Sequence, residues 1–180
     1  IPYRQDNDPP PLPEAYGEIV RRHCGQLGMK VLVEPGRLIV GNAGILVTSV
    51  VYVKGGEHKN FVIVDAAMND LIRPTLYDAY HHIDPVVEAD FNAPRITADI
   101  VGPVCETGDY LALDRDMPLP EPGDLLSVAT AGAYGAVQAG TYNTRLLVPE
   151  VLVNGDRVHV IRPRRTYEEL IGLDSVPDWL

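Results

Sequence analysis

Leu46-Val-Thr-Ser-Val-Val-Tyr-Val53 decides the fold class, because it is rich in the β-branched and aromatic residues that strands favour. Leu46, Thr48, Val50 and Tyr52 are expected on one face of this strand. Gly55-Gly56-Glu57 follows and Phe61–Val64 then returns, which predicts a β-hairpin. Further strands are expected at Ile96–Val101, Tyr110–Leu113, Leu125–Ala129, Leu146–Val153 and Val158–Ile161, with Asn154-Gly155-Asp156 as a hairpin turn between the last two. Residues 38–180 are therefore predicted to be mainly β, as a β-barrel or sandwich domain.

Residues 1–37 have a different pattern. The Pro-rich lead-in of residues 5–13 cannot form the interior of a helix. From Glu14 to Gly28, apolar residues recur at helical spacing, and Val31–Val33 then forms a short apolar run. A helix, a strand and a polar loop at the end of that strand make one unit of a (β/α) barrel. Residues 1–37 are thus predicted to be the C-terminal remnant of a TIM barrel.

The composition restricts the class of function. The formal net charge of -10 argues against nucleic-acid binding, since phosphate contacts need a basic face. The 2 cysteines form no CxxC motif, which disfavours a disulfide scaffold or structural zinc and favours a reducing, cytoplasmic setting. No apolar run approaches the roughly 20 residues that span a bilayer. His81 and His82 are adjacent, so they point apart and do not make a pair of metal ligands.

Glu34-Pro35-Gly36-Arg37 is the first segment with candidate chemistry. A Gly at the end of a strand lets backbone N–H groups approach a phosphate, and an adjacent Arg can bind phosphate or carboxylate. Glu34 could pair with a protonated pyridine nitrogen. Taken alone, these four residues more often form an ordinary turn.

Two further loops and one short helix carry candidate groups. Cys105 lies in Gly102–Asp109, outside any apolar periodicity, as a loop thiol would; a small buried Cys with solvated turn acids is the alternative. Tyr134 stands among the small residues of Ala131–Gly135, where a backbone can come close to a ligand; a β-bulge with an edge tyrosine fits equally well. A short helix expected between Leu71 and Tyr80 carries Arg73 and Tyr77 four residues apart, on one face.

Together these segments resemble the diaminopimelate decarboxylase family, fold-type III enzymes that depend on pyridoxal 5′-phosphate (PLP) and are related to ornithine and arginine decarboxylases and to alanine racemase. Four ordered strings carry the resemblance from Glu34 onward: Glu34-Pro-Gly-Arg37, the run from His58 to Pro74, Cys105-Glu-Thr-Gly-Asp109 and Ala131-Gly-Ala-Tyr-Gly135. Ile1-Pro2-Tyr3 is similar to the residues just after that family's glycine-rich phosphate loop. The resemblance implies a mainly β C-terminal domain preceded by the last αβ unit of a (β/α)8 barrel.

The resemblance also implies roles for individual residues. Glu34 would contact the pyridine nitrogen of PLP, and Pro35, Gly36 and Arg37 would line its phosphate or the substrate. Arg73 and Tyr77 would bind the distal carboxylate of the substrate, and Glu106 its distal ammonium. Cys105 would be the catalytic proton donor, supplied to the partner subunit's site in a homodimer, and Tyr134 would touch cofactor and substrate. A dicarboxylate with two amino groups needs a cation and an acid in fixed geometry, which Arg73 and Glu106 would supply.

The chain departs from this family's pattern in one respect. The family binds PLP through a lysine of the early barrel, whereas the lysines here are Lys30, Lys54 and Lys59, none of them placed for that role. We therefore expect the chain to be the C-terminal part of a longer protein, with the missing N-terminal barrel portion as its partner, and to be inactive alone.

Three alternatives stay open at this stage. An ornithine, arginine or carboxynorspermidine decarboxylase is the nearest, although Arg73 followed by Tyr77 favours a dicarboxylate substrate. A non-catalytic pseudoenzyme that regulates a true decarboxylase is compatible with the absent lysine. A plain β-barrel binding module would leave the ordered motifs unexplained.

Overall fold

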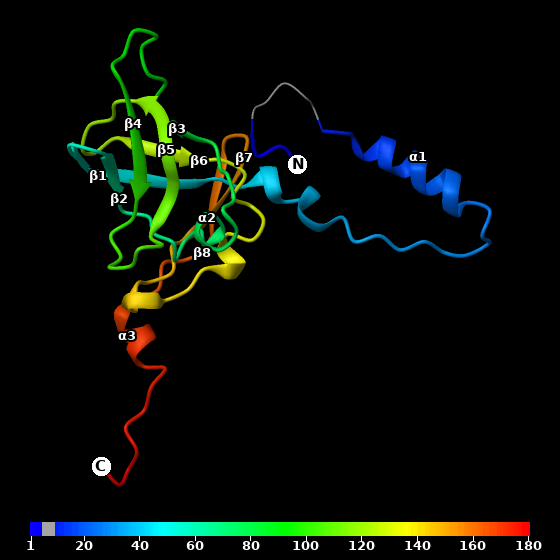
Figure 1. Cartoon of the computed structure of the whole chain (residues 1–180). Helices are drawn as coiled ribbons and strands as arrows, with labels where there is room; N and C mark the ends of the chain where they lie inside the picture. Colours follow the sequence, from blue (N-terminus) through cyan, green and yellow to red (C-terminus); the bar gives the residue numbers. More distant parts are fainter. Residues whose placement is uncertain (5–9) are drawn as a thin grey trace.

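Six strands form the principal sheet of the computed structural model, which describes residues 1–4 and 10–180. Their order across the sheet is β3-β6-β1-β2-β4-β5, and the sheet curls into a nearly closed, barrel-like body (Figure 1). The strands are β1 Leu46–Lys54, β2 Asn60–Val64, β3 Ile83–Pro85, β4 Arg95–Val101, β5 Tyr110–Pro118 and β6 Leu125–Val128. Neighbouring strands are antiparallel except β2 and β4, which are parallel.

β1 lies inside the sheet, and its two halves pair with different strands. Residues 46–49 pair with β6, whereas residues 50–54 pair with β2, and the register shifts between Val50 and Tyr52. Such a bulge bends a strand and turns the side chains that follow it. Thr48 and Val50 are buried as expected from the sequence, but Tyr52 is exposed and Val53 packs against the core. The prediction that Tyr52 shares their face was therefore wrong.

The hydrophobic core lies inside the curled sheet. Val62, Val64, Ile100, Leu126 and Val128 have no exposed surface, and they come from β2, β4 and β6. Leu71, from the segment after β2, packs into the same cluster. Burial of this kind stabilises by about 1.5–3 kcal/mol for each large aliphatic side chain. We call residues 46–145, which include this core and the loops that pack on it, the sheet body.

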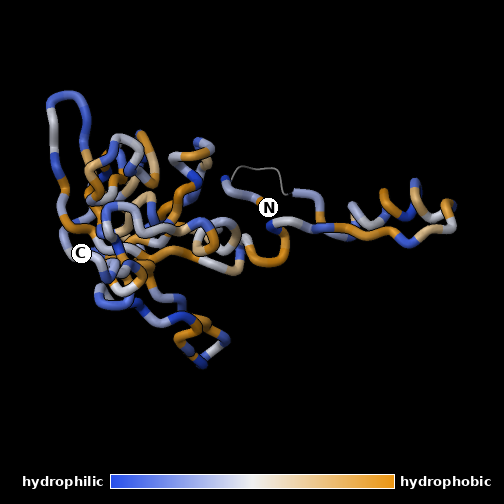
Figure 2. Tube along the Cα trace, turned by 90° about the horizontal axis from the view of Figure 1, so that it is seen from below, coloured by the Kyte–Doolittle hydropathy of each residue, from blue (hydrophilic) through white to orange (hydrophobic). Residues whose placement is uncertain are grey.

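The flanking segments, residues 12–40 and 150–180, form regular elements that bury little. These are α1 Pro13–Cys24, the hairpin of β7 Glu150–Asn154 and β8 Arg157–Arg162, and α3 Tyr167–Ile171. α1 has Pro at its first turn, where a missing N–H costs nothing, and α3 begins with a capping box between Thr166 and Glu169. Neither helix has a buried residue. α1 projects away from the sheet body (Figure 1), and apolar stretches run along that projecting arm (Figure 2).

Most strands expected from the sequence are confirmed. The 46–64 hairpin, the strands at 96–101, 110–113 and 125–129, the Asn154–Asp156 turn and the last helix all form. The strand expected at Leu146–Val153 begins only at Glu150, because Pro149 has no N–H to donate to a ladder. β3 was not anticipated, since it is short and ends in Pro85. The lead-in of residues 5–13 is described only from residue 10, and residues 5–9 lie outside the described part.

Two expected elements differ from the structure. The helix expected between Leu71 and Tyr80 is reduced to α2, Arg73–Tyr77, because Asp78 takes a left-handed conformation with φ 52° and ends it. The strand expected at Val31–Val33 is wrong: these residues are exposed and form no strand in the described chain. A strand needs a neighbour to share its backbone hydrogen bonds, and the described residues offer none there.

Candidate active site

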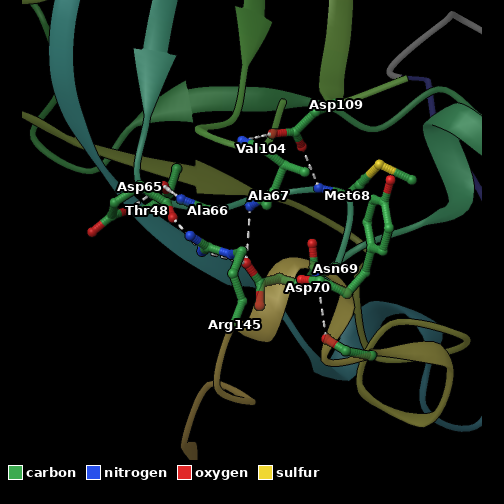
Figure 3. Close-up of polar contacts among 12 residues, drawn as sticks. Thr48, Asp65, Ala66, Ala67, Met68, Asn69, Asp70, Val104, Asp109 and Arg145 are labelled. Atoms are coloured by element: carbon green, nitrogen blue, oxygen red, sulfur yellow. Dashed lines mark hydrogen bonds and ion pairs between the residues drawn. The ribbon is translucent and has the colours of Figure 1, made fainter. Parts of the chain in front are cut away.

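The segment between β2 and α2, residues 65–72, is the centre of the candidate site (Figure 3). Asp65 Oδ1 accepts hydrogen bonds from Thr48 Oγ1 at 2.6 Å and from the Ser49 amide at 2.8 Å. Thr48 Oγ1 in turn accepts from the Ala66 amide at 2.9 Å. These bonds satisfy groups that the turn after β2 would otherwise leave unpaired, and they fix the direction in which the segment leaves the sheet.

Asp70 holds the second turn of this segment. Its Oδ2 accepts from the Ala67 amide at 2.9 Å and lies 3.5 Å from Arg145 Nη2. Arg145 Nη2 also donates to the Asp65 backbone carbonyl at 2.7 Å, so one guanidinium ties both acidic residues together. Burial raises the pKa of the Asp70 carboxyl, and the bonds to Ala67 and Arg145 partly offset this.

Asp109 attaches the loop 102–109 to the same segment. Its Oδ1 accepts from the Met68 amide and its Oδ2 from the Val104 amide, both at 2.6 Å, and its side chain is buried. Gly102 has no room for a side chain, because a Cβ there would lie 2.5 Å from Asp109 Oδ2. The alternative reading of Asp109 as a solvated turn acid is therefore wrong; it is the internal anchor of the loop.

Cys105 and Glu106 stand at the exposed tip of this anchored loop. The Tyr142 hydroxyl lies 3.4 Å from Glu106 Oε2, at the long end of a hydrogen bond. At the base of the loop, Thr75 Oγ1 donates to the Gly108 carbonyl, which joins the loop to α2. The alternative of a buried packing cysteine is wrong for Cys105 in this chain. An exposed thiol and carboxylate are thus presented side by side next to the helix that carries Arg73.

Arg73 and Tyr77 are at the two ends of α2 and in different environments. Arg73 is 6% exposed and Tyr77 58% exposed. Their spacing of four residues suggested one shared face, but one side chain is buried and the other is exposed. Arg73 Nη1 is 2.9 Å from His81 Nε2, and its guanidinium carbon lies 4.5 Å from the centre of the Tyr3 ring. The structure buries His81 completely.

Arg37 and Tyr134 meet through a close contact between two loops. The Ala131 amide donates to Gly44 and the Gly132 amide to Gly41, and a Cβ on Gly132 would lie 1.9 Å from the Val40 carbonyl oxygen. This approach, which only Gly permits, brings Arg37 to 5.2 Å from the Tyr134 ring centre and 5.7 Å from that of Tyr3. The small residues were expected to let a ligand approach; at Gly132 it is the chain itself that approaches.

Glu34, Pro35 and Gly36 are exposed, and Gly36 is the first residue of the 3₁₀ turn Gly36–Leu38. Gly36 has φ +58°, a conformation that favours Gly, and no atom lies within 4 Å of the position its Cβ would take. The structure thus brings Arg37, Tyr134, Tyr3 and Arg73 into one aromatic and cationic cluster. Cys105 and Glu106 lie on the exposed loop that Thr75 joins to α2, and Glu34 and Tyr77 are also exposed.

Several residues of the site were missed from the sequence. Tyr3, Asn69 and Tyr142 had no assigned role, although the Asn69 side-chain amide donates to the Gly140 and Tyr142 carbonyls at 2.9 Å each. The adjacent Asn69 and Asp70, set between apolar residues, were the available signal, because buried polar groups need specific partners. Among the described residues, no three His, Cys, Asp or Glu side chains are grouped to hold a metal ion. No helix there is long and apolar enough to cross a membrane.

The fold is thus a curled, mostly antiparallel sheet whose connecting loops present an exposed thiol and carboxylate, together with two arginines packed against tyrosine rings. The chain belongs to the family of pyridoxal-dependent decarboxylases: residues 15–132 match the model of their C-terminal sheet domain. This confirms the fold class expected from the sequence, a mainly β C-terminal domain of a fold-type III decarboxylase.

Individual relatives are diaminopimelate decarboxylases. The chain is 55% identical to that of Neisseria meningitidis serogroup A over 92% of its own length, and 45% identical to that of Zymomonas mobilis over 100%. The solved diaminopimelate decarboxylase of M. jannaschii in complex with L-lysine superimposes over the whole chain with a TM-score of 0.89 at 36% identity. The chain spans 40% and 42% of the length of the two sequence relatives and 42% of the solved chain.

Proposed function

We propose that this chain is the C-terminal part of a decarboxylase that converts meso-2,6-diaminopimelate to L-lysine and carbon dioxide with PLP. The observation that carries the proposal is the combination of a buried arginine and an exposed thiol–carboxylate pair at one edge of the sheet body, in a chain 55% identical to a diaminopimelate decarboxylase. Residues 1–37 would then belong to a TIM barrel and residues 38–180 to the sheet domain. We infer a cytoplasmic enzyme, since such a substrate is a small polar metabolite.

Recognition of the substrate would depend on opposite charges at fixed positions. Arg73 would bind the carboxylate remote from the reacting carbon, and its burial favours this because ion pairs gain strength where water is excluded. Tyr77 would add a hydroxyl to that carboxylate. Glu106, next to the hydroxyl of Tyr142, would bind the remote ammonium. Ornithine and arginine lack the remote carboxylate, so this pair of charges selects against them.

The residues near Arg37 are suited to hold part of the cofactor. Arg37 offers a cation for the phosphate, Gly36 offers a backbone with open space around it, and Tyr134 offers an exposed phenol. Glu34, exposed just before them, would pair with the pyridine nitrogen, and Pro35 would fix the turn. PLP, when bound, takes up the electron pair that carbon dioxide leaves behind. The lysine that carries it would lie in another part of the protein, since Lys59 is engaged with Asp99 at 2.8 Å.

Cys105 would donate the proton that completes the reaction. Its thiol is exposed at the tip of an anchored loop, so it can reach a carbon held by another surface. We propose that this surface is the partner subunit's active site in a homodimer, since two-fold pairing is the commonest symmetry. Exchange of a Cys105→Ala subunit with a subunit lacking the PLP lysine should restore partial activity. No restoration would mean that each site is built from one chain.

The test of the proposed function is carbon dioxide release by the whole protein that contains this chain. Diaminopimelate should be preferred over ornithine, arginine and carboxynorspermidine. Arg73→Ala should lower kcat/KM for diaminopimelate by roughly 30- to 1,000-fold, as expected for the loss of about 2–4 kcal/mol from a charge-assisted pair. Equal loss with lysine or ornithine, which lack the remote carboxylate, would make Arg73 structural. Release from none of the four substrates would favour a non-catalytic regulator.

A further inference from the structure

His81 lies between α2 and β3, and its side chain has no exposed surface. Both ring nitrogens have partners: Nδ1 is 2.9 Å from the Ala129 carbonyl oxygen, and Nε2 is 2.9 Å from Arg73 Nη1. A carbonyl can only accept, so Nδ1 must carry the proton. A guanidinium can only donate, so Nε2 must be the bare acceptor. The contacts therefore define one neutral tautomer.

The surroundings hold both members of this pair in place. Arg115 Nη1 donates to the His81 backbone carbonyl at 2.9 Å, and the Ala129 amide donates to the His82 carbonyl at 2.8 Å. The Tyr3 ring meets the imidazole edge-on, with centres 5.2 Å apart, and also covers the Arg73 guanidinium. The imidazole is thus fixed from its backbone, from Nδ1 and from one face, which leaves it little freedom to move away from Arg73.

Arg73 is unusual in being buried against a neutral acceptor. Buried charges are normally paired with an opposite charge. The ion pairs among residues 1–4 and 10–180 do not include Arg73. An aspartate in place of His81 would orient the guanidinium but would also cancel its charge. A neutral imidazole orients it and leaves the charge available for an anion, and it occupies one of the five N–H donors.

We propose that His81 is a positioning residue for substrate recognition: its neutral Nε2 aims the Arg73 guanidinium so that the remaining N–H groups bind the remote carboxylate of a dicarboxylic substrate. The inference rests on the role proposed above for Arg73. His81 itself touches neither substrate nor cofactor in this scheme. Its effect is confined to ligands that carry the second carboxylate.

Two isosteric substitutions separate the two bonds of the imidazole. In His81→Gln the amide oxygen can take the place of Nε2 and accept from Arg73. In His81→Asn the shorter amide can donate to Ala129 but cannot reach Arg73. In the whole decarboxylase, His81→Asn should raise KM for diaminopimelate by about tenfold or more, the range for a lost hydrogen bond to a charged group. The KM of His81→Gln for diaminopimelate should stay within about threefold of the wild-type value. Inhibition by L-lysine, which lacks the second carboxylate, should change by no more than about twofold in either variant.

A measurement on the wild-type protein tests the inference without activity. With ¹⁵N placed only in histidine rings, long-range ¹⁵N–¹H spectra should show His81 as the neutral tautomer with its proton on Nδ1. A proton on Nε2 would overturn the inference, as would equal effects of the two substitutions on KM or an equal loss of lysine inhibition. If wild type released no carbon dioxide from diaminopimelate, the proposed function would fail. The tautomer would still show whether the neutral Nε2 of His81 orients Arg73.

Discussion

The sheet body and the flanking segments obey the same local rules but differ in what they bury. In the sheet body, strands and loops close over a core in which Val62, Val64 and Ile100 have no exposed surface. In the flanks, α1 begins with a Pro in its first turn, α3 begins with a capping box, and β7 and β8 form a hairpin, yet Ile19 is 53% exposed and Val153 63%. Local sequence signals therefore specify these helices and the hairpin. Burial of their apolar side chains, however, requires a second surface on which they can pack.

The candidate site contains residues of both kinds: some are anchored by the sheet body, and others lie on an exposed flanking segment. Arg73 begins α2 directly after the segment that Asp70 anchors, and Cys105 and Glu106 lie on the loop that Asp109 anchors, so contacts within the chain fix their positions. Glu34 and Gly36 lie on an exposed segment, and of this segment Arg37 contacts the sheet body, through the Tyr134 ring. Groups of the first kind are preorganised. Groups of the second kind are not held in place by the sheet body.

The largest effect is expected at Cys105. In the whole enzyme, Cys105→Ala should lower turnover by about 10²- to 10⁴-fold, the usual contribution of a general acid. Because the thiol is exposed at a loop tip, the same change should leave Tm and the absorbance of bound PLP nearly unaltered. The measurement is kcat per PLP-loaded dimer, together with thermal unfolding.

Cys105→Ser is the matched control for this prediction. A hydroxyl gives up its proton far less readily than a thiol, so serine should rescue little of the lost turnover. An unchanged kcat in Cys105→Ala would remove Cys105 from the mechanism. A lower Tm or weaker dimer with normal turnover would mean that the thiol packs at an interface instead.

The sheet body was largely predictable from the sequence, and the reason is local. Phe61–Val64 and Leu125–Val128 are short, mostly apolar runs bounded by turn residues, so pattern alone located β2 and β6. The same pattern at Val31–Val33 produced no strand, because strand formation needs a partner that the pattern does not supply. The inward turn of Val53 was not predictable, since the bulge in β1 depends on two different neighbours.

The candidate site was predictable as a set of motifs but not as an arrangement. Cys105, Glu106 and Arg73 were selected by residue type and by a family resemblance. The buried role of Asp109 and the tautomer of His81 depend on contacts with Met68 and Ala129, 41 and 48 residues away in sequence. Spacing along one element does not reveal such contacts, which is also why Tyr77 was expected to share the setting of Arg73.

The next effect concerns Asp109, the anchor of the loop 102–109. Asp109→Asn should lower the free energy of unfolding by about 1–3 kcal/mol, because one amide NH₂ would then face a backbone N–H in place of an acceptor. Asp116 offers a matched control, because it lies on β5, the strand that follows this loop, but is exposed and paired with Arg95. Asp116→Asn should cost no more than about 1 kcal/mol. Urea unfolding compares the two, and equal losses would contradict the distinction between anchored loops and surface.

A smaller effect should appear in the pH dependence of stability. Burial lowers the pKa of His81 below the ordinary value of 6.5, and the nearby charges of Arg73 and Arg115 act in the same direction. The unfolded chain therefore binds a proton more readily, so stability is complete above pH 6.5 and is lost as pH falls through the folded pKa. The slope for one proton is at most about 1.4 kcal/mol per pH unit. His81→Gln should lack this component, and parallel curves of unfolding free energy for both proteins would refute the assignment.

The smallest effect should come from the flanks, and it tests the comparison most directly. Val64 in β2 has no exposed surface, whereas Val153 in β7 is 63% exposed. Val→Thr keeps the β-branched shape, so at both positions it changes little except the cost of placing a hydroxyl there. In the 180-residue chain, Val64→Thr should lower the free energy of unfolding by about 1–3 kcal/mol, and Val153→Thr should change it by no more than about 0.5 kcal/mol.

In the whole protein, the cost of Val153→Thr should rise toward that of Val64→Thr if another surface covers the β7–β8 hairpin. The threonine hydroxyl would then lose water without gaining a hydrogen-bond partner. Denaturant unfolding of both variants in both contexts gives the four values. A large cost at Val153 in the chain alone would mean that the hairpin is already packed, and the division into sheet body and flanks would have to be redrawn.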